Sequence, residues 1–152
     1  MHKGIEKLKK DRAFYITLLE GLTTEQLNTI PNGFNNNIIW NFGHLIATLQ
    51  SICYIRAGID VAIDEKYIQA YKPGTKPDQF VNEAEIATMK LLMISSIERF
   101  ETDYNNHLFS DYKSWTTRTG IDVGDIEDAI NYTFFHDGLH TGYTMALKRQ
   151  IS

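Results

Sequence analysis

Apolar residues recur every three or four positions in four long segments of the chain, which is the spacing of one face of an α-helix. In the second segment, Ile38, Phe42 and Leu45 are separated by four and then three positions. No run alternates apolar and polar residues between hairpin turns, so no strand is expected. The pattern predicts an all-α protein whose long helices cover residues 5–20, 38–57, 82–107 and 122–152.

Capping residues set the expected helix ends. Gly58 follows the second segment, where glycine readily takes the left-handed conformation that ends a helix. Asn82 stands three residues before Glu85, which is the spacing of a capping box. Asp122, with Asp125 three residues later, has the same spacing and is expected to cap the last helix.

The segment between the second and third helices is long and contains two prolines, which exclude a continuous helix. We expect a crossover over residues 59–81 with one short helical turn near residues 64–70, and a second short turn at 24–27. Four long helices joined with one long crossover predict a four-helix bundle. The length of 152 residues predicts a single domain, residues 1–152.

Composition narrows the class of protein. Apolar residues make up 43% and charged residues 22%, as in ordinary globular proteins. The net charge of −4 argues against a nucleic-acid partner. Acidic residues interrupt the basic cluster at positions 7–12, so it is expected to be a solvated helix face. The cluster includes Arg12, although helical spacing also places Arg12 near the apolar stripe of the first helix. A single cysteine, no apolar leader and no apolar run near about 18 residues predict a cytoplasmic protein without a membrane span.

His136 and His140 are four residues apart in the last predicted helix. At about 100° and 1.5 Å per residue they project from one face, one turn apart. Neutral imidazole binds zinc, nickel, copper and iron, so the pair is a plausible half of a metal site. The same spacing also suits two core or capping histidines.

A third ligand is needed, and His44 is the best candidate among the other histidines. It lies in mid-helix beside the apolar stripe, which directs it toward the interior. Its neighbour Gly43 costs about 1 kcal/mol relative to alanine in a helix, which indicates close approach of a helix or a ligand. His107 is expected to bond the last carbonyls of the third helix, and His2 to lie in a frayed terminus.

The sequence gives weaker support to two other chemistries, a metalloprotease site and a cysteine nucleophile. The segment 136–140 has the histidine spacing of a metalloprotease, but Asp137 replaces the glutamate and Gly138 weakens the helix. We expect Asp137 to accept a bond near the metal or to face solvent. Cys53 lies among apolar residues without a basic neighbour, so it is expected to be buried rather than a nucleophile.

Aromatic residues also accompany the histidines at helical spacing. Most of them are expected to belong to the core, and some to wall a pocket. Tyr132 and Tyr143, each near a histidine, are candidates to bond a ligand. The group consists of Trp40, Tyr132, Phe134, Phe135 and Tyr143.

The chain resembles the DinB/YfiT-like family over most of its length. The similar parts are His44 within residues 39–45, the His136–His140 helix, the long crossover and the approach at residues 117–124. The resemblance implies an up-down-down-up bundle with His44, His136 and His140 around a zinc or nickel ion, often in a homodimer. Characterised members include transferases and isomerases that use low-molecular-weight thiols such as bacillithiol, mycothiol or glutathione.

Three neutral histidines leave a coordination position open, and a divalent ion there deprotonates a thiol or a water at neutral pH. The sequence therefore favours a metal-dependent thiol transferase or isomerase acting on a small molecule, with a hydrolase second. The alternative is a non-catalytic helical dimer with a weak or vestigial metal site. The first and last helices have apolar residues on more than one face, which offers a dimer surface.

Overall fold

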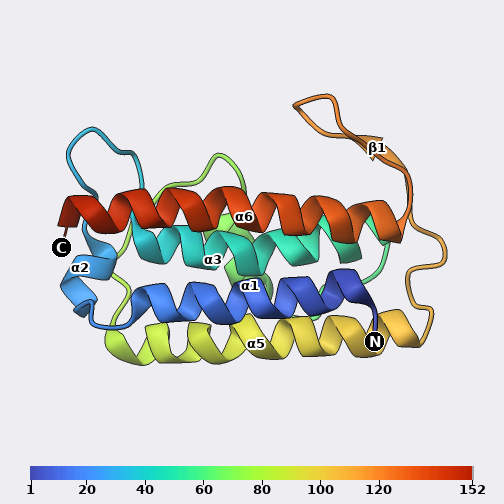
Figure 1. The fold of residues 1–152 in the computed structure, drawn as a ribbon, viewed down its shortest axis with the longest axis horizontal. Coiled ribbons are helices and arrows are strands. Elements are labelled where there is room, and N and C mark those ends of the chain that lie inside the picture. Colours follow the sequence, from blue (N-terminus) through green and yellow to red (C-terminus); the bar gives the residue numbers. More distant parts are fainter. Residues whose placement is uncertain (152) are drawn as a thin grey trace.

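A computed structural model describes residues 1–151 and is mostly helical (Figure 1). The second long helix continues through a π-helical turn at Gln50–Tyr54 and a 3-10 turn at Ile55–Ala57. The prediction of an all-α protein is therefore confirmed, in that the structure is mostly helical. The α-helices are α1 (Lys3–Leu19), α2 (Thr24–Asn28), α3 (Ile38–Leu49), α4 (Glu65–Tyr71), α5 (Glu83–Asn105) and α6 (Ile126–Ile151).

Four long helices, α1, α3, α5 and α6, lie side by side (Figure 1). Helix α1 packs against both α5 and α6, and α3 packs against the same two helices. The colours of Figure 1 show that α1 and α6 run in one direction and that α3 and α5 run in the other. Helix α4, in the crossover, packs on α3. The two helices that carry the candidate ligands, α3 and α6, are therefore neighbours.

Most predicted helix boundaries are confirmed. The Asn82 side chain accepts a bond from the Glu85 amide at 2.9 Å and begins α5. Gly58 ends the second helix with φ 72°, a conformation that glycine adopts without strain. Asp64 caps the short helix α4, and Thr23 opens α2 with a complete capping box.

The start of the last helix was predicted wrongly. Asp125, not Asp122, is its cap, because the Asp125 carboxylate accepts the Asp128 amide at 2.9 Å. Asp122 belongs instead to a two-residue strand, β2 (Asp122–Val123), which pairs antiparallel with β1 (Trp115–Thr116). The expectation of no strand was therefore also wrong. Two residues are too few to produce a visible alternation of apolar and polar positions.

The end of α5 differs in its chemistry from the prediction. The helix ends at Asn105, and His107 has a left-handed backbone with φ 58°. The amides of His107 and Leu108 donate to the carbonyls of Tyr104 and Asp103, which is the bonding of a Schellman motif. The backbone of His107, rather than its imidazole, bonds the last carbonyls.

His2 does not lie in a frayed terminus. Its Nδ1 accepts the amides of Gly4 and Ile5 at 3.1 and 3.3 Å and so caps α1. Its Nε2 lies 2.6 Å from a carboxylate oxygen of Glu127 at the start of α6. These bonds attach the N-terminal residues to two helices.

Helix α3 is buried along its whole length. Residues Ile38–Ala57 are long and apolar enough, by length and composition, to cross a membrane, and within residues 1–151 no other helix meets that test. From the sequence, no apolar run near about 18 residues was expected, and this segment corrects that expectation because its mean hydropathy is high although polar residues interrupt it. Here 89% of the window is buried against the rest of the protein, as in the core helix of a globular domain.

Arg12 corrects the prediction of a solvated basic face at the start of the chain. Lys7 and Lys10 are exposed, but Arg12 has no exposed surface. Helical spacing places position 12 on the same stripe as Leu8 and Tyr15, which are also fully buried. Position along the helix, and not residue type, decides where this side chain lies.

Candidate metal centre

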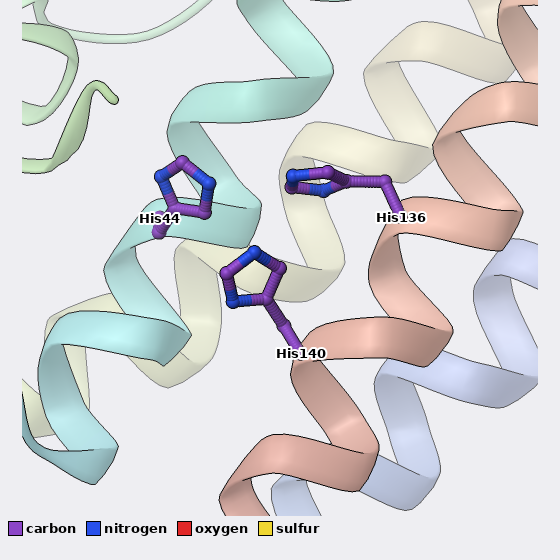
Figure 2. A group of neighbouring side chains, drawn as sticks. All are labelled: His44, His136 and His140. Carbon is purple, nitrogen blue, oxygen red and sulfur yellow. The ribbon is translucent and has the colours of Figure 1, made fainter. Parts of the chain in front are cut away.

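Three histidines converge between α3 and α6 (Figure 2). His44 comes from α3, whereas His136 and His140 come from successive turns of α6. One nitrogen atom of each lies within 4.8 Å of the other two. Nitrogen ligands at about 2.1 Å from one tetrahedral zinc ion are roughly 3.4 Å apart, so small side-chain movements would bring all three onto one ion.

The orientation of His44 is fixed by the crossover. Its Nδ1 lies 2.6 Å from the backbone carbonyl of Tyr71 at the end of α4. A carbonyl only accepts, so Nδ1 carries the proton and Nε2 keeps a free lone pair. The Trp40 ring stacks on the imidazole with centroids 4.8 Å apart and an angle of 12°. His44 is therefore held in the tautomer that a metal ligand needs.

Asn41 fixes the orientation of His140 in the same way. Its side-chain oxygen lies 2.8 Å from Nδ1 of His140. The side-chain nitrogen of Asn41 donates to the Asn36 side chain and to the Asn37 carbonyl, so the oxygen must face the imidazole and accept from it. Nε2 of His140 is left free. Sequence reasoning missed Asn41, although a polar residue three positions before His44 in an apolar helix was a signal.

His136 completes the group, and its environment fits a metal ligand. Its Nδ1 is buried and has no hydrogen-bond partner among residues 1–151, which is costly unless something else binds it. Burial, helped by the other two imidazoles, lowers the pKa of His136 to about 3. Burial also lowers the pKa of His140 to about 4 and lowers that of His44. All three are neutral at pH 7, as divalent-metal binding requires.

Gly43 explains how α4 comes close enough to bond His44. A Cβ atom at this position would lie 2.7 Å from ring atoms of Tyr71, a distance that no side chain tolerates without movement. The expected close approach is confirmed, and the neighbour is the last residue of α4. Glycine here lets the Tyr71 carbonyl reach the imidazole.

A family model for the DinB superfamily matches residues 7–144. The chain belongs to the DinB superfamily. The matched range includes all three histidines and all four long helices in large part. A search of curated proteins found no match.

Asp137 does not act with the histidines of this DinB-superfamily chain. It is fully buried, and its carboxylate points toward α1, where Arg12 Nε donates to it at 2.9 Å. The expectation that it faces solvent was wrong, and as an acceptor it bonds Arg12 rather than a histidine. A residue directed away from the histidines is not placed to be a general base, so the protease-like reading has no support in this geometry.

Cys53 is buried as predicted. Burial raises the pKa of its thiol to about 12, and its Sγ lies 3.9 Å from the Thr133 hydroxyl. The thiol is therefore protonated at neutral pH and has little nucleophilic character.

The aromatic residues divide into two groups. Trp40 is buried against His44, and the Tyr132 ring lies 6.2 Å from that of His136. The other three are 38–50% exposed, so the expectation that they belong to the core was wrong for Phe134, Phe135 and Tyr143.

A cavity of about 370 Å³ lies beside the histidines, between α4, the crossover and the start of α5. Trp40 and Tyr71 line it, and both also contact His44. Tyr67, Lys76 and Glu85 contribute polar groups to its wall. Two residues of the cavity lining thus also contact His44, Trp40 through its ring and Tyr71 through its backbone carbonyl.

We expect Gly43→Ala to lower the free energy of unfolding by about 1–3 kcal/mol, because the new methyl group overpacks against Tyr71. This loss should exceed the gain in helix propensity of about 1 kcal/mol. Gly142→Ala is the matched control, since a Cβ atom there meets nothing within 4 Å, and it should stabilise. Urea unfolding measures both, and a stabilised Gly43→Ala variant would contradict the close approach.

We expect Asn41→Leu to weaken metal binding about 10–100-fold, because His140 loses the acceptor that sets its tautomer. Asn131→Leu, on the exposed face of α6, is the control. Competition against a chromophoric chelator measures both affinities. Equal affinities would show that Asn41 does not orient the ligand.

Proposed function

We propose that this DinB-superfamily chain binds a divalent metal ion through His44, His136 and His140 and is a metal-dependent enzyme. The observation that carries the proposal is a group of three neutral imidazoles in which Tyr71 and Asn41 each fix one tautomer. Such outer partners are typical of metal-bound histidines. Imidazole ligands suit zinc, nickel, copper and iron, and among these the family resemblance implies zinc or nickel. The directions of the long helices support an up-down-down-up four-helix bundle as its frame.

We propose thiol transfer or isomerisation as the reaction. An ion with three protein ligands keeps an open position, where it lowers the pKa of a thiol or a water. His136 and His140 are partly exposed, whereas His44 is 4% exposed. Among residues 1–151 the group contains no carboxylate. Metalloproteases add a glutamate general base to the metal-bound water, and the lack of such a group here favours the thiol reaction over hydrolysis.

The lining of the neighbouring cavity favours a small-molecule substrate that carries both a positive and a negative charge. Lys76 and Glu85 line it, and the Glu85 carboxylate accepts from the Tyr67 hydroxyl at 2.8 Å. Trp40 offers an aromatic surface between the cavity and His44. These groups suit a low-molecular-weight thiol that carries amino and carboxyl groups.

We also propose a homodimer through α6. Phe135 is 50% exposed, Leu139 is 55% exposed and Met145 is 46% exposed on this helix, and exposed apolar patches often mark interfaces. A cytoplasmic location suits the one free cysteine, Cys53. The alternative function is a non-catalytic helical dimer whose metal site is weak or vestigial.

Metal analysis of the protein purified without a polyhistidine tag tests the proposal. We expect about one ion per chain after loading with zinc or nickel. Fewer than roughly 0.1 ion per chain would refute the metal site. Metal-loaded protein is then incubated with low-molecular-weight thiols and an electrophile, and thiol consumption is measured. Full metal loading without thiol consumption above the metal-free control would favour the non-catalytic alternative.

A further inference from the structure

Arg12 of α1 bonds both helices that carry the histidines. Its Nε donates to Asp137 of α6 at 2.9 Å, and its Nη2 donates to the backbone carbonyl of Leu45 in α3 at 2.8 Å. The guanidinium and the carboxylate are fully buried. A guanidinium is planar and rigid, so two bonds from it fix the separation of the groups that they join. A helix without a ligand histidine therefore links the two helices that have them.

The bonded positions directly follow two of the histidines. Leu45 follows His44 on α3, and Asp137 follows His136 on α6. Successive residues of a helix point about 100° apart, so His136 faces α3 while the Asp137 side chain faces α1. On α3, the group that bonds Arg12 is the backbone carbonyl of Leu45. The link through Arg12 thus lies at the level of the histidine group.

A second bond between α1 and α6 provides a comparison. The hydroxyls of Tyr15 and Thr144 are bonded to each other, and both residues are fully buried. This pair lies about one turn farther along α1 than Arg12. This hydroxyl bond joins α1 to α6 and includes no group of α3.

We propose that Arg12 is a positioning residue for the metal centre, setting the separation of α3 and α6 at the level of the three histidines. The inference rests on the proposed metal function. Ligands that are already close lose little freedom when the ion binds, which raises affinity. Without the link, the ion itself has to hold the two helices at that separation.

The test removes the link without leaving a buried unpaired charge. The variant Arg12→Met with Asp137→Leu replaces the ion pair by apolar side chains, a change that proteins often tolerate. Metal-free wild type and variant are titrated with Zn²⁺ in competition with a chromophoric chelator. We expect a folded variant by circular dichroism with a Zn²⁺ affinity about 10–100-fold lower. The absorption spectrum of bound Co²⁺, which reports ligand geometry, should also change.

Tyr15→Phe with Thr144→Val is the matched control, and its Zn²⁺ affinity should stay within roughly threefold of wild type even where its stability falls. Wild-type affinity in the Arg12 variant, or equal losses in both variants, would overturn the positioning role. A wild-type protein that binds no Zn²⁺ would refute the proposed metal function instead. If the double variant does not fold, Arg12→Lys replaces it, because lysine keeps the charge beside Asp137 but lacks the second arm.

Discussion

His44→Ala is expected to lower the affinity for zinc or nickel by more than about 100-fold, beyond the 10–100-fold loss typical of an outer partner. Its imidazole is the ligand that α3 contributes, and the two histidines of α6 are then left as a half-site. His136→Ala and His140→Ala should each have a similar effect. Chelator competition with Zn²⁺ measures the loss directly.

The same variant should lose the thermal stabilisation that metal gives the wild type. An ion at 100 times its dissociation constant stabilises the folded state by about 2.7 kcal/mol, so the melting temperature of the wild type should rise on loading. His107→Asn is the control, because His107 is exposed and asparagine tolerates its positive φ. A His44→Ala variant that keeps wild-type affinity would rule out this histidine as a ligand.

Arg12→Met alone should lower the free energy of unfolding by about 3–5 kcal/mol, because it leaves the Asp137 carboxylate buried without its partner. Burial already raises the pKa of Asp137 to about 6, while Arg12 acts in the opposite direction. The loss is a large part of the 5–15 kcal/mol that usually stabilises a domain. Urea unfolding of the metal-free protein measures it.

A double-mutant cycle gives the control for this second prediction. Asp137→Leu alone leaves the guanidinium unpaired and should also destabilise strongly, whereas the double variant should be close to wild type. The coupling energy between the two positions is then several kcal/mol in magnitude. If the two substitutions changed the free energy of unfolding additively, the Arg12 and Asp137 charges would not stabilise each other.

The helices and most of their ends followed from the sequence because they depend on nearby residues. Asn82 and Gly58 act on backbone groups within one turn, so their spacing was sufficient. The Asp122 prediction failed because two aspartates three residues apart both suited a cap. Pairing of residues 115–116 with 122–123 decided between them, and such pairing depends on contacts that local spacing does not contain.

For the three histidines, too, helix geometry predicted one part of the site and helix packing determined the rest. His136 and His140 share a face of one helix, so their pairing is a property of helix geometry, which the sequence by itself determines. His44 was the best third candidate from its place in an apolar helix and from the family resemblance. The convergence of all three on one point was visible only when α3 and α6 lay side by side.

The groups that support the histidines became visible only when the helices were packed together. Asn41 bonds a residue 99 positions away, and Arg12 bonds one 125 positions away. From the sequence, Arg12 belonged to a basic face and also lay near the apolar stripe of its helix, and Asp137 was assigned to a metal site or to solvent. A charged side chain is buried only where a partner of opposite charge meets it across a helix interface, and that meeting depends on how the helices pack.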